Sequence, residues 1–391
     1  MLLFILGLIM FVGLVVVHEF GHFIMAKRNG VEIEEFGIGF PPRLFKKKTK
    51  GGWLFTINLL PLGGFVKLKG EHDTDTAPGT FGAASLPAKS KIMAAGVVMN
   101  LITAFVLLTG LAWAGTPILI CNQFTLKQDT HVVQDTRHLY AGLVEPDSPA
   151  SKIGLQKGDE LLAVGSSANN LHRILPECQF SDITKQHAGQ PLVLKFKHQG
   201  KVIVRTAQLV STAEVQKSQD TKHPKAYLGV GVDGSGLAYN RSTWSAPIVA
   251  GGLIKQFTVL TFQGLGKAVA GLGSLIAGGV TGNKTARQHG QTSASSQVSG
   301  PVGIFVILKD GSALGYRFIL LIIAIISLTL AIMNILPIPA LDGGRLWLML
   351  ITRAIKKPLS QDKEELINAG GFIFLLLLIV LITIVDIRRF F

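Results

Sequence analysis

The chain alternates long apolar runs with stretches that are rich in charged and polar residues. Four apolar runs are close to or above the roughly 20 residues that a helix needs to cross a bilayer. They cover residues 2–26, 92–115, 318–336 and 366–385. This pattern predicts a mainly α-helical polytopic membrane protein with about four transmembrane helices.

A further apolar stretch, residues 246–280, has its polar side chains on one side. On a helix with about 100° per residue they fall within one sector of about 120°. This pattern is typical of a helix that lies in the membrane interface. A fifth crossing would also put Asp342 and His22 on opposite sides of the membrane. We therefore expect an interfacial helix here, followed by a flexible Ser/Gln/Thr-rich linker at 281–298. The polar residues are Lys255, Gln256, Gln263, Lys267 and Ser274.

The basic residues predict the orientation of the four helices. The chain has 38 Lys and Arg against 24 Asp and Glu, and 11 basic but only 6 acidic residues lie between the first two apolar runs. Short loops with excess Lys and Arg face the cytoplasm. Both termini and the segment 116–316 are therefore expected on the other side. No nucleic-acid-reading motif accompanies the positive charge, so nucleic acid is not an expected partner.

A smaller folded domain is predicted within the outer segment. Residues 191–197 and 201–209 alternate apolar and polar positions around a Gln-Gly turn, which is typical of a β-hairpin. Upstream, SPA at 148–150 and GLQKGD at 154–159 resemble the turn and short helix of a PDZ domain. The resemblance covers 130–212 and implies an α+β domain that binds extended peptides or C-termini. A degenerate domain that only acts as a steric plug is the alternative.

Cys121 and Cys178 are the two cysteines of the chain, and both lie in this outer segment. Neither belongs to a CxxC pair, so a thiolate metal site is not expected. A disulfide is permitted outside the cytoplasm. Two unpaired cysteines are equally compatible with the sequence.

The first apolar run contains HEFGH at residues 18–22, which fits the HExxH pattern. On a helix His18 and His22 share one face, so both imidazoles can bind one Zn²⁺ while Glu19 lies beside its water. An ionisable residue in a lipid-length helix costs at least about 2.5 kcal/mol unless it is paired or liganded. Three such residues at ligand spacing therefore favour a zinc site over an ordinary polar helix end.

Two histidines leave a catalytic zinc one protein ligand short. The best candidate is Asp342, in the sequence NILPIPALDGG at 334–344, which interrupts the third apolar run with prolines. The predicted topology has the first and third helices running in the same direction, so His22 and Asp342 lie near the same side of the bilayer. An ordinary turn aspartate is the alternative.

These motifs together resemble those of the bacterial site-2 proteases, in particular the regulator of sigma-E protease group, here with a single PDZ domain. The resemblance includes HEFGH, NILPIPALDGG and SGPVGI at 299–304. It implies an intramembrane zinc metalloprotease with Glu19 as catalytic base and His18, His22 and Asp342 as zinc ligands. It also implies a substrate-binding segment at Asn334, Pro337 and Pro339.

The resemblance extends to partners and location. It implies membrane-protein substrates with one transmembrane helix, such as anti-sigma factors or remnant signal peptides, in regulated intramembrane proteolysis. It also implies the bacterial cytoplasmic (inner) membrane and a membrane-associated β segment within the first loop. The expected order is a first span at 1–26, a cytoplasmic-side loop at 27–91, a second span at 92–115, an outer region with the PDZ domain at 116–240, an interfacial helix and linker at 241–313, a third span at 314–345, and a connection with the fourth span at 346–391.

Two alternatives come from other classes. A membrane PDZ scaffold with a silent metal site is disfavoured, because both histidines, Asp342 and Glu19 are all present. Another membrane HExxH enzyme, such as a prenyl-protein endopeptidase, would use a different third ligand. The identity of the third ligand separates that class from the site-2 proteases.

Overall fold

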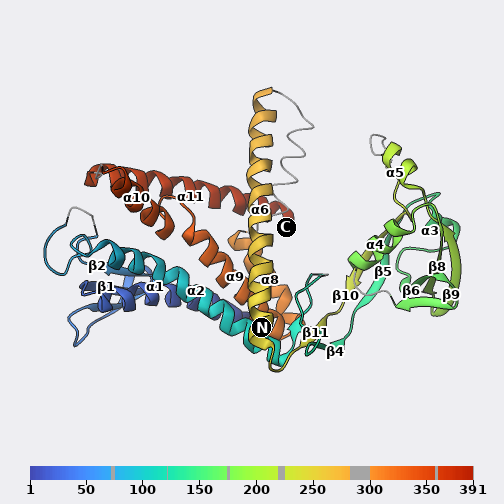
Figure 1. Ribbon diagram of the computed structural model, residues 1–391, viewed down its shortest axis with the longest axis horizontal. Coiled ribbons are helices and arrows are strands. Elements are labelled where there is room, and N and C mark those ends of the chain that lie inside the picture. Colours follow the sequence, from blue (N-terminus) through green and yellow to red (C-terminus); the bar gives the residue numbers. More distant parts are fainter. Residues whose placement is uncertain are drawn as a thin grey trace. The chain divides into compact units, whose positions relative to one another are not determined.

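Two units, each with its own hydrophobic core, make up the computed structural model shown in Figure 1. One unit consists of Met1–Thr116 with Ser242–Phe391 and contains the long helices, and the other is Pro117–Arg241. The structure describes residues 1–71, 75–120, 122–173, 177–218, 225–281, 300–356 and 360–390.

Two expectations fall outside these residues. The linker expected at 281–298 lies, apart from Thr281, outside the described part of the chain. Cys121 lies outside it as well, so pairing with Cys178 is not addressed by the structure.

The first unit is built on long apolar helices. Five of them are long and apolar enough to cross a membrane, which makes the chain a multi-pass membrane protein with an added β domain. The helices of this unit are α1 (Leu2–Arg28), α2 (Leu86–Ala114), α6 (Ala246–Thr281), α8 (Pro301–Gly311), the 3₁₀ turn η1 (Ser312–Leu314), α9 (Tyr316–Ile335), α10 (Asp342–Ala354) and α11 (Gln361–Phe390).

Helix α1 ends where polar residues return in the sequence. Its last turn carries Lys27 and Arg28, whose charges interact favourably with the negative end of the helix dipole. Asn29 is the C-cap, and Gly30 has a φ of 75°, a left-handed conformation that glycine adopts without strain. The chain then leaves the helix for a strand.

Helices α1, α2 and α9 pack against one another, and Figure 1 shows them side by side. Leu14 of α1 and Ile319 and Ile323 of α9 form a shared buried cluster with Leu308 of α8. Helices α1 and α2 approach closely at Gly21, where a Cβ atom would lie 2.6 Å from the carbonyl oxygen of Ala95. Such a small residue lets two membrane helices bring their backbones together.

Two long strands, β1 (Ile33–Lys48) and β2 (Leu54–Leu68), follow α1 and pair antiparallel. Residues 35–38 have partners on both sides, with 64–67 along one edge and 54–57 along the other, and Ile33 pairs with Leu68. The edge at 64–68 faces α1, because the Val66 N–H donates a hydrogen bond to the Glu19 carboxylate at 3.1 Å. The β segment expected in the first loop is thus present, and its association with the membrane stays a prediction.

The segment expected to form the third span, 314–345, contains two helices joined by a turn. Helix α9 ends at Ile335 and α10 begins at Asp342. Pro337 and Pro339 explain the break, because proline has no N–H to donate within a helix and its ring clashes with the preceding turn. Gly344 lets α10 start against this turn, since a Cβ atom there would collide with the carbonyl oxygen of Ile338.

Helix α6 is among the five candidate spans by length and composition. It packs against α2 and α9. Neither observation distinguishes a crossing helix from one that lies in the interface. The expected count of four spans therefore stays a prediction.

The second unit is an antiparallel sheet with short helices. Its main sheet has the order β10-β5-β6-β8-β9, with β7 paired to β6, so it includes β10 beyond the expected PDZ core at 130–212. Leu161, Leu192 and Phe196 lie in its buried cluster. The elements are β3 (Thr116–Pro117, at the boundary between the units), β4 (His131–Asp135), β5 (His138–Val144), α3 (Pro149–Lys152), β6 (Glu160–Ser167), β7 (Asn170–Arg173), α4 (Glu177–Gln186), β8 (Pro191–His198), β9 (Lys201–Gln208), α5 (Thr212–Ser218), β10 (Val230–Ser235) and β11 (Ala238–Arg241), which pairs with β4.

A buried carboxylate ties the last helix to the start of α8. Asp386 of α11 is fully buried, and its Oδ2 accepts hydrogen bonds from the backbone N–H groups of Gly300 and Gly303, both at 2.8 Å. The first N–H groups of a helix have no partner within it. Asp386 therefore caps α8, which gives the SGPVGI sequence a structural role.

The position of α6 can be tested with single cysteines in a variant that has serine at both native cysteine positions. We expect Gln263→Cys in intact cells to react with a membrane-impermeant maleimide, because an interfacial helix exposes this polar sector to water. Leu265→Cys, about 160° around the helix from Gln263 and on the apolar side, is the control and should be protected. Protection of both positions would contradict the interfacial arrangement.

Candidate metal centre and active site

Two imidazoles from α1 meet inside the first unit. His18 and His22 are one helical turn apart, and each exposes only 6% of its surface. Their Nε2 atoms lie 3.3 Å from each other. The four-residue spacing predicted this arrangement, because residues i and i+4 share a helix face.

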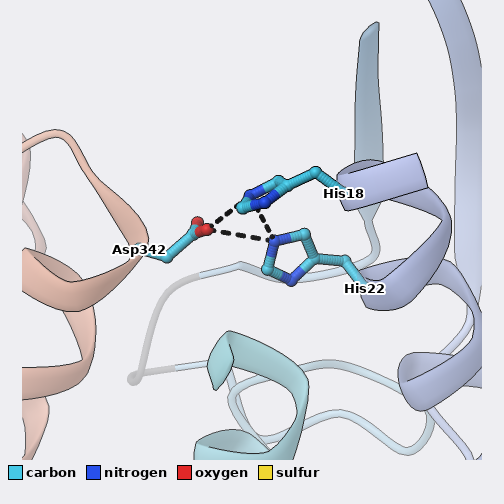
Figure 2. Close-up of side chains that lie close together, drawn as sticks. All are labelled: His18, His22 and Asp342. Atoms are coloured by element: carbon cyan, nitrogen blue, oxygen red, sulfur yellow. Dashed lines mark hydrogen bonds and ion pairs between the residues drawn. The ribbon is translucent and has the colours of Figure 1, made fainter. Parts of the chain in front are cut away.

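Asp342 completes the cluster from the first turn of α10, as Figure 2 shows. Its Oδ2 lies 2.8 Å from Nε2 of His18 and 3.1 Å from Nε2 of His22. The two histidines come from one segment, and Asp342 is at least 320 residues further along the sequence. The structure thus brings together the three residues that the sequence predicted as metal ligands.

The distances between these three atoms fit a zinc ion. In a tetrahedral site with bonds of about 2.0–2.1 Å, neighbouring ligand atoms lie roughly 3.3 Å apart. The observed separations are 2.8, 3.1 and 3.3 Å. Two nitrogens and one carboxylate oxygen are also a donor set that zinc enzymes use, with the fourth position left for water or substrate. His18, His22 and Asp342 could therefore hold the metal.

Each imidazole has a second contact through its other nitrogen. Nδ1 of His22 lies 2.8 Å from the carbonyl oxygen of Ile92, and the side-chain amide of Asn100 lies 3.2 Å from Nδ1 of His18. Such contacts fix the orientation of a metal-binding imidazole. Both come from α2, so α2 orients the two histidines of α1.

Glu19 is next to the cluster but outside it. Its Oε2 accepts the hydrogen bond from the Val66 N–H of β2. Glu19, His18 and Asp342 all line a cleft of about 210 Å³. A carboxylate held by one oxygen beside such a cleft can accept a proton from water bound there.

Of the three substrate-binding residues expected from the resemblance, one lines the cleft and the other two do not. Asn334 lines the cleft, together with Leu330, Ala340 and Leu341. Pro337 and Pro339 are not among its lining residues in the described part of the chain. Pro339 lies against Gly371 of α11 instead. A substrate role for these three residues stays a prediction.

Gly96 of α2 leaves space for the imidazole rings of His18 and His22, because it has no side chain. A Cβ atom at this position would lie 2.5 Å from Nε2 of His18 and 2.5 Å from Nε2 of His22. Real Cβ atoms do not approach other atoms so closely. The sequence AGVVMN at 95–100 contains both Gly96 and Asn100. Their pattern in the sequence predicts no function for either residue, because their contacts depend on how α1 and α2 pack.

A donor set of this kind, buried among helices of membrane length, is typical of a membrane metallopeptidase. The sequence profile of peptidase family M50 matches residues 6–378. A protein of Clostridium perfringens named as a zinc metalloprotease, CPE1693, is 31% identical over 383 residues, which cover 98% of both chains. This chain belongs to peptidase family M50, the site-2 protease family.

Two further relatives carry protease names. The protease eep of Enterococcus faecalis is 28% identical, with 98% of both chains covered. Zinc metalloprotease RasP of Geobacillus kaustophilus is 27% identical, with 98% of this chain and 97% of RasP covered. The family assignment and these relatives make the protein a zinc metalloendopeptidase of the membrane, as the sequence predicted.

Gly96→Ala tests whether the close approach of α2 shapes the metal centre. The added methyl group would push the two imidazoles away from their present positions, so we expect zinc content per purified protein to fall at least about tenfold. Gly110→Ala is the matched control on the same helix, because a Cβ atom there meets nothing within 4 Å. Full zinc content in both variants would contradict the observed packing.

Proposed function

We propose that the protein hydrolyses peptide bonds within or near the transmembrane segment of single-span membrane proteins. The position of the metal cluster on α1 carries this proposal. His18 lies ten residues before Arg28, which is about 15 Å along the helix from its charged end. Cleavage at this depth requires a substrate that enters the bilayer.

His18, His22 and Asp342 are the proposed zinc ligands, and Glu19 is the proposed catalytic base. Bound zinc supplies Lewis acidity and lowers the pKa of the water that it holds to about 7. The Val66 N–H fixes one oxygen of Glu19. The other oxygen is then available to accept a proton from the attacking water and to pass it to the leaving amine.

The substrate must be extended where it is cut, because the carbonyl groups of an intact helix are bonded within the helix. The edge of β2 at 64–68 is adjacent to Glu19, and its N–H groups at Val66 and Leu68 already donate to Glu19 and Glu71. The backbone carbonyl groups of this edge are therefore the proposed partners of an extended chain. Asn334 lines the same cleft, and its side chain is proposed to contact the substrate backbone. The β segment would then hold the substrate within reach of Glu19.

Further parts of the proposal concern location and regulation. We propose a bacterial inner-membrane protein with both termini and the second unit outside the cytoplasm, because the loop at 27–91 is basic. Anti-sigma-factor-like proteins or remnant signal peptides are the proposed substrates in regulated intramembrane proteolysis. A PDZ domain in the second unit would limit the size of substrates or bind their peptide ends.

Glu19→Gln and Asp342→Ala test the two roles separately with a model single-span substrate in lipid nanodiscs. We expect Glu19→Gln to retain zinc but to lower the rate of cleavage by about 10²–10⁴-fold, the usual contribution of a general base. Asp342→Ala is expected to lose both zinc and cleavage. Cleavage by Glu19→Gln at the wild-type rate would contradict the mechanism, and full zinc content in Asp342→Ala would favour another class of HExxH enzyme.

Replacement of the second unit, Pro117–Arg241, by a short Gly/Ser linker tests its role in selection. The whole unit must be exchanged, because β10 pairs with β5 and a deletion of 130–212 would break the sheet. We expect the variant to cleave substrates with a large outer domain that the full chain spares. A trimmed substrate and the zinc content are the controls and should be unaffected. Unchanged selectivity would contradict a size filter.

A further inference from the structure

Asn100 stands out among the buried polar residues of α2. It is fully buried, and its side-chain Nδ2 is the amide atom that lies 3.2 Å from Nδ1 of His18. Its Oδ1 is also buried and has no hydrogen-bond partner among the described residues. A buried amide oxygen without a partner costs about 1–3 kcal/mol, so this arrangement calls for an explanation.

The chemistry of His18 indicates that the amide has the opposite orientation when a metal is bound. Its Nε2 faces Asp342 and His22, so the lone pair that binds a metal must be on Nε2. A neutral imidazole with a free lone pair on Nε2 carries its proton on Nδ1. The Nδ1–H group is then a donor, and an NH₂ group opposite it cannot accept the hydrogen bond. Rotation of the Asn100 amide by 180° about its terminal bond puts Oδ1 at that position instead.

We propose that Asn100 is a positioning residue that accepts the Nδ1–H of His18 through Oδ1 and thereby holds Nε2 toward the metal. The neighbouring histidine has an equivalent contact, since the carbonyl oxygen of Ile92 lies beside Nδ1 of His22. Each imidazole would then have one oxygen acceptor from α2. The inference rests on the proposed role of His18 as a zinc ligand.

The backbone of Asn100 is itself anchored. Ser327 of α9 is fully buried, and its hydroxyl donates a hydrogen bond to the Asn100 carbonyl oxygen at 2.8 Å. This contact ties α2 to α9 without involving the Asn100 side chain. Ser327→Ala therefore removes a structural contact of the same residue while leaving the side-chain amide in place, which makes it a matched control.

Zinc affinity of the full chain in detergent, measured by competition with a chromogenic chelator, tests the proposal without use of activity. Asn100→Leu keeps a similar volume but has no acceptor, and we expect it to weaken zinc binding about 10–100-fold. Asn100→Asp has an oxygen at both positions and should stay within a few fold of wild type. Ser327→Ala should lower the unfolding temperature of the metal-free protein more than it lowers zinc affinity.

Several outcomes would overturn the inference. Wild-type zinc affinity in Asn100→Leu would show that the contact does not matter, and equal loss in Asn100→Leu and Asn100→Asp would show that an acceptor is not what matters. If Asn100→Leu does not fold, Asn100→Ala takes its place with the same expected loss. His18→Ala distinguishes a failure of the proposed ligand set from a failure of the proposed role of Asn100. Unchanged zinc affinity in that variant would refute the proposed ligand set, whereas loss of zinc there with none in Asn100→Leu would refute only the role of Asn100.

Discussion

The cost of placing ionisable groups in an apolar helix is the constraint on which the site depends. Glu19 and two histidines lie within a helix whose other residues suit hydrocarbon, and each would be unfavourable there without a partner. The structure gives each of them one. Glu19 has the Val66 N–H, and the histidines have Asp342 along with contacts from α2. Strand β2, helix α2 and the start of α10 all contact this part of α1, and each supplies a partner for one of its ionisable side chains.

Backbone proximity is the second requirement. The nitrogens of both histidines lie where a side chain of α2 would ordinarily project, and only glycine at position 96 leaves that space. Asp342 reaches the cluster because α9 stops at Ile335 and a new helix starts at the aspartate itself. A straight third helix through this region would continue past the site. The metal centre therefore depends on the close approach of α2 to α1 at Gly96 and on the break between α9 and α10.

Two sequence patterns predicted the central part of the site, which consists of His18, His22 and Asp342. They are the four-residue spacing of the histidines and the excess of basic residues in the first loop. The spacing of His18 and His22 placed them on one face of a helix, and the basic first loop predicted Asp342 on the same side of the membrane as His22. The roles of Gly96, Asn100 and Val66 could not be obtained in this way, because each contact joins residues about 45 to 80 positions apart through helix or strand packing. The sequence did not predict the full extent of the sheet in the second unit for a similar reason. Strand β10 comes after helix α5 in the sequence, and it joins the sheet by pairing with β5.

The contact between Asp386 and the start of α8 has a consequence for assembly. Asp386 follows Gly300 by 86 residues and Gly303 by 83, so it is synthesised well after both glycines. Until α11 has been inserted, the N–H groups of Gly300 and Gly303 lack this acceptor, and each would be costly to bury in lipid. Helix α8, which packs on α1 and α9, can therefore reach its final position only after α11 is in place. The packing that α8 contributes next to α1 and α9 thus depends on Asp386, a residue more than 80 positions further along the chain.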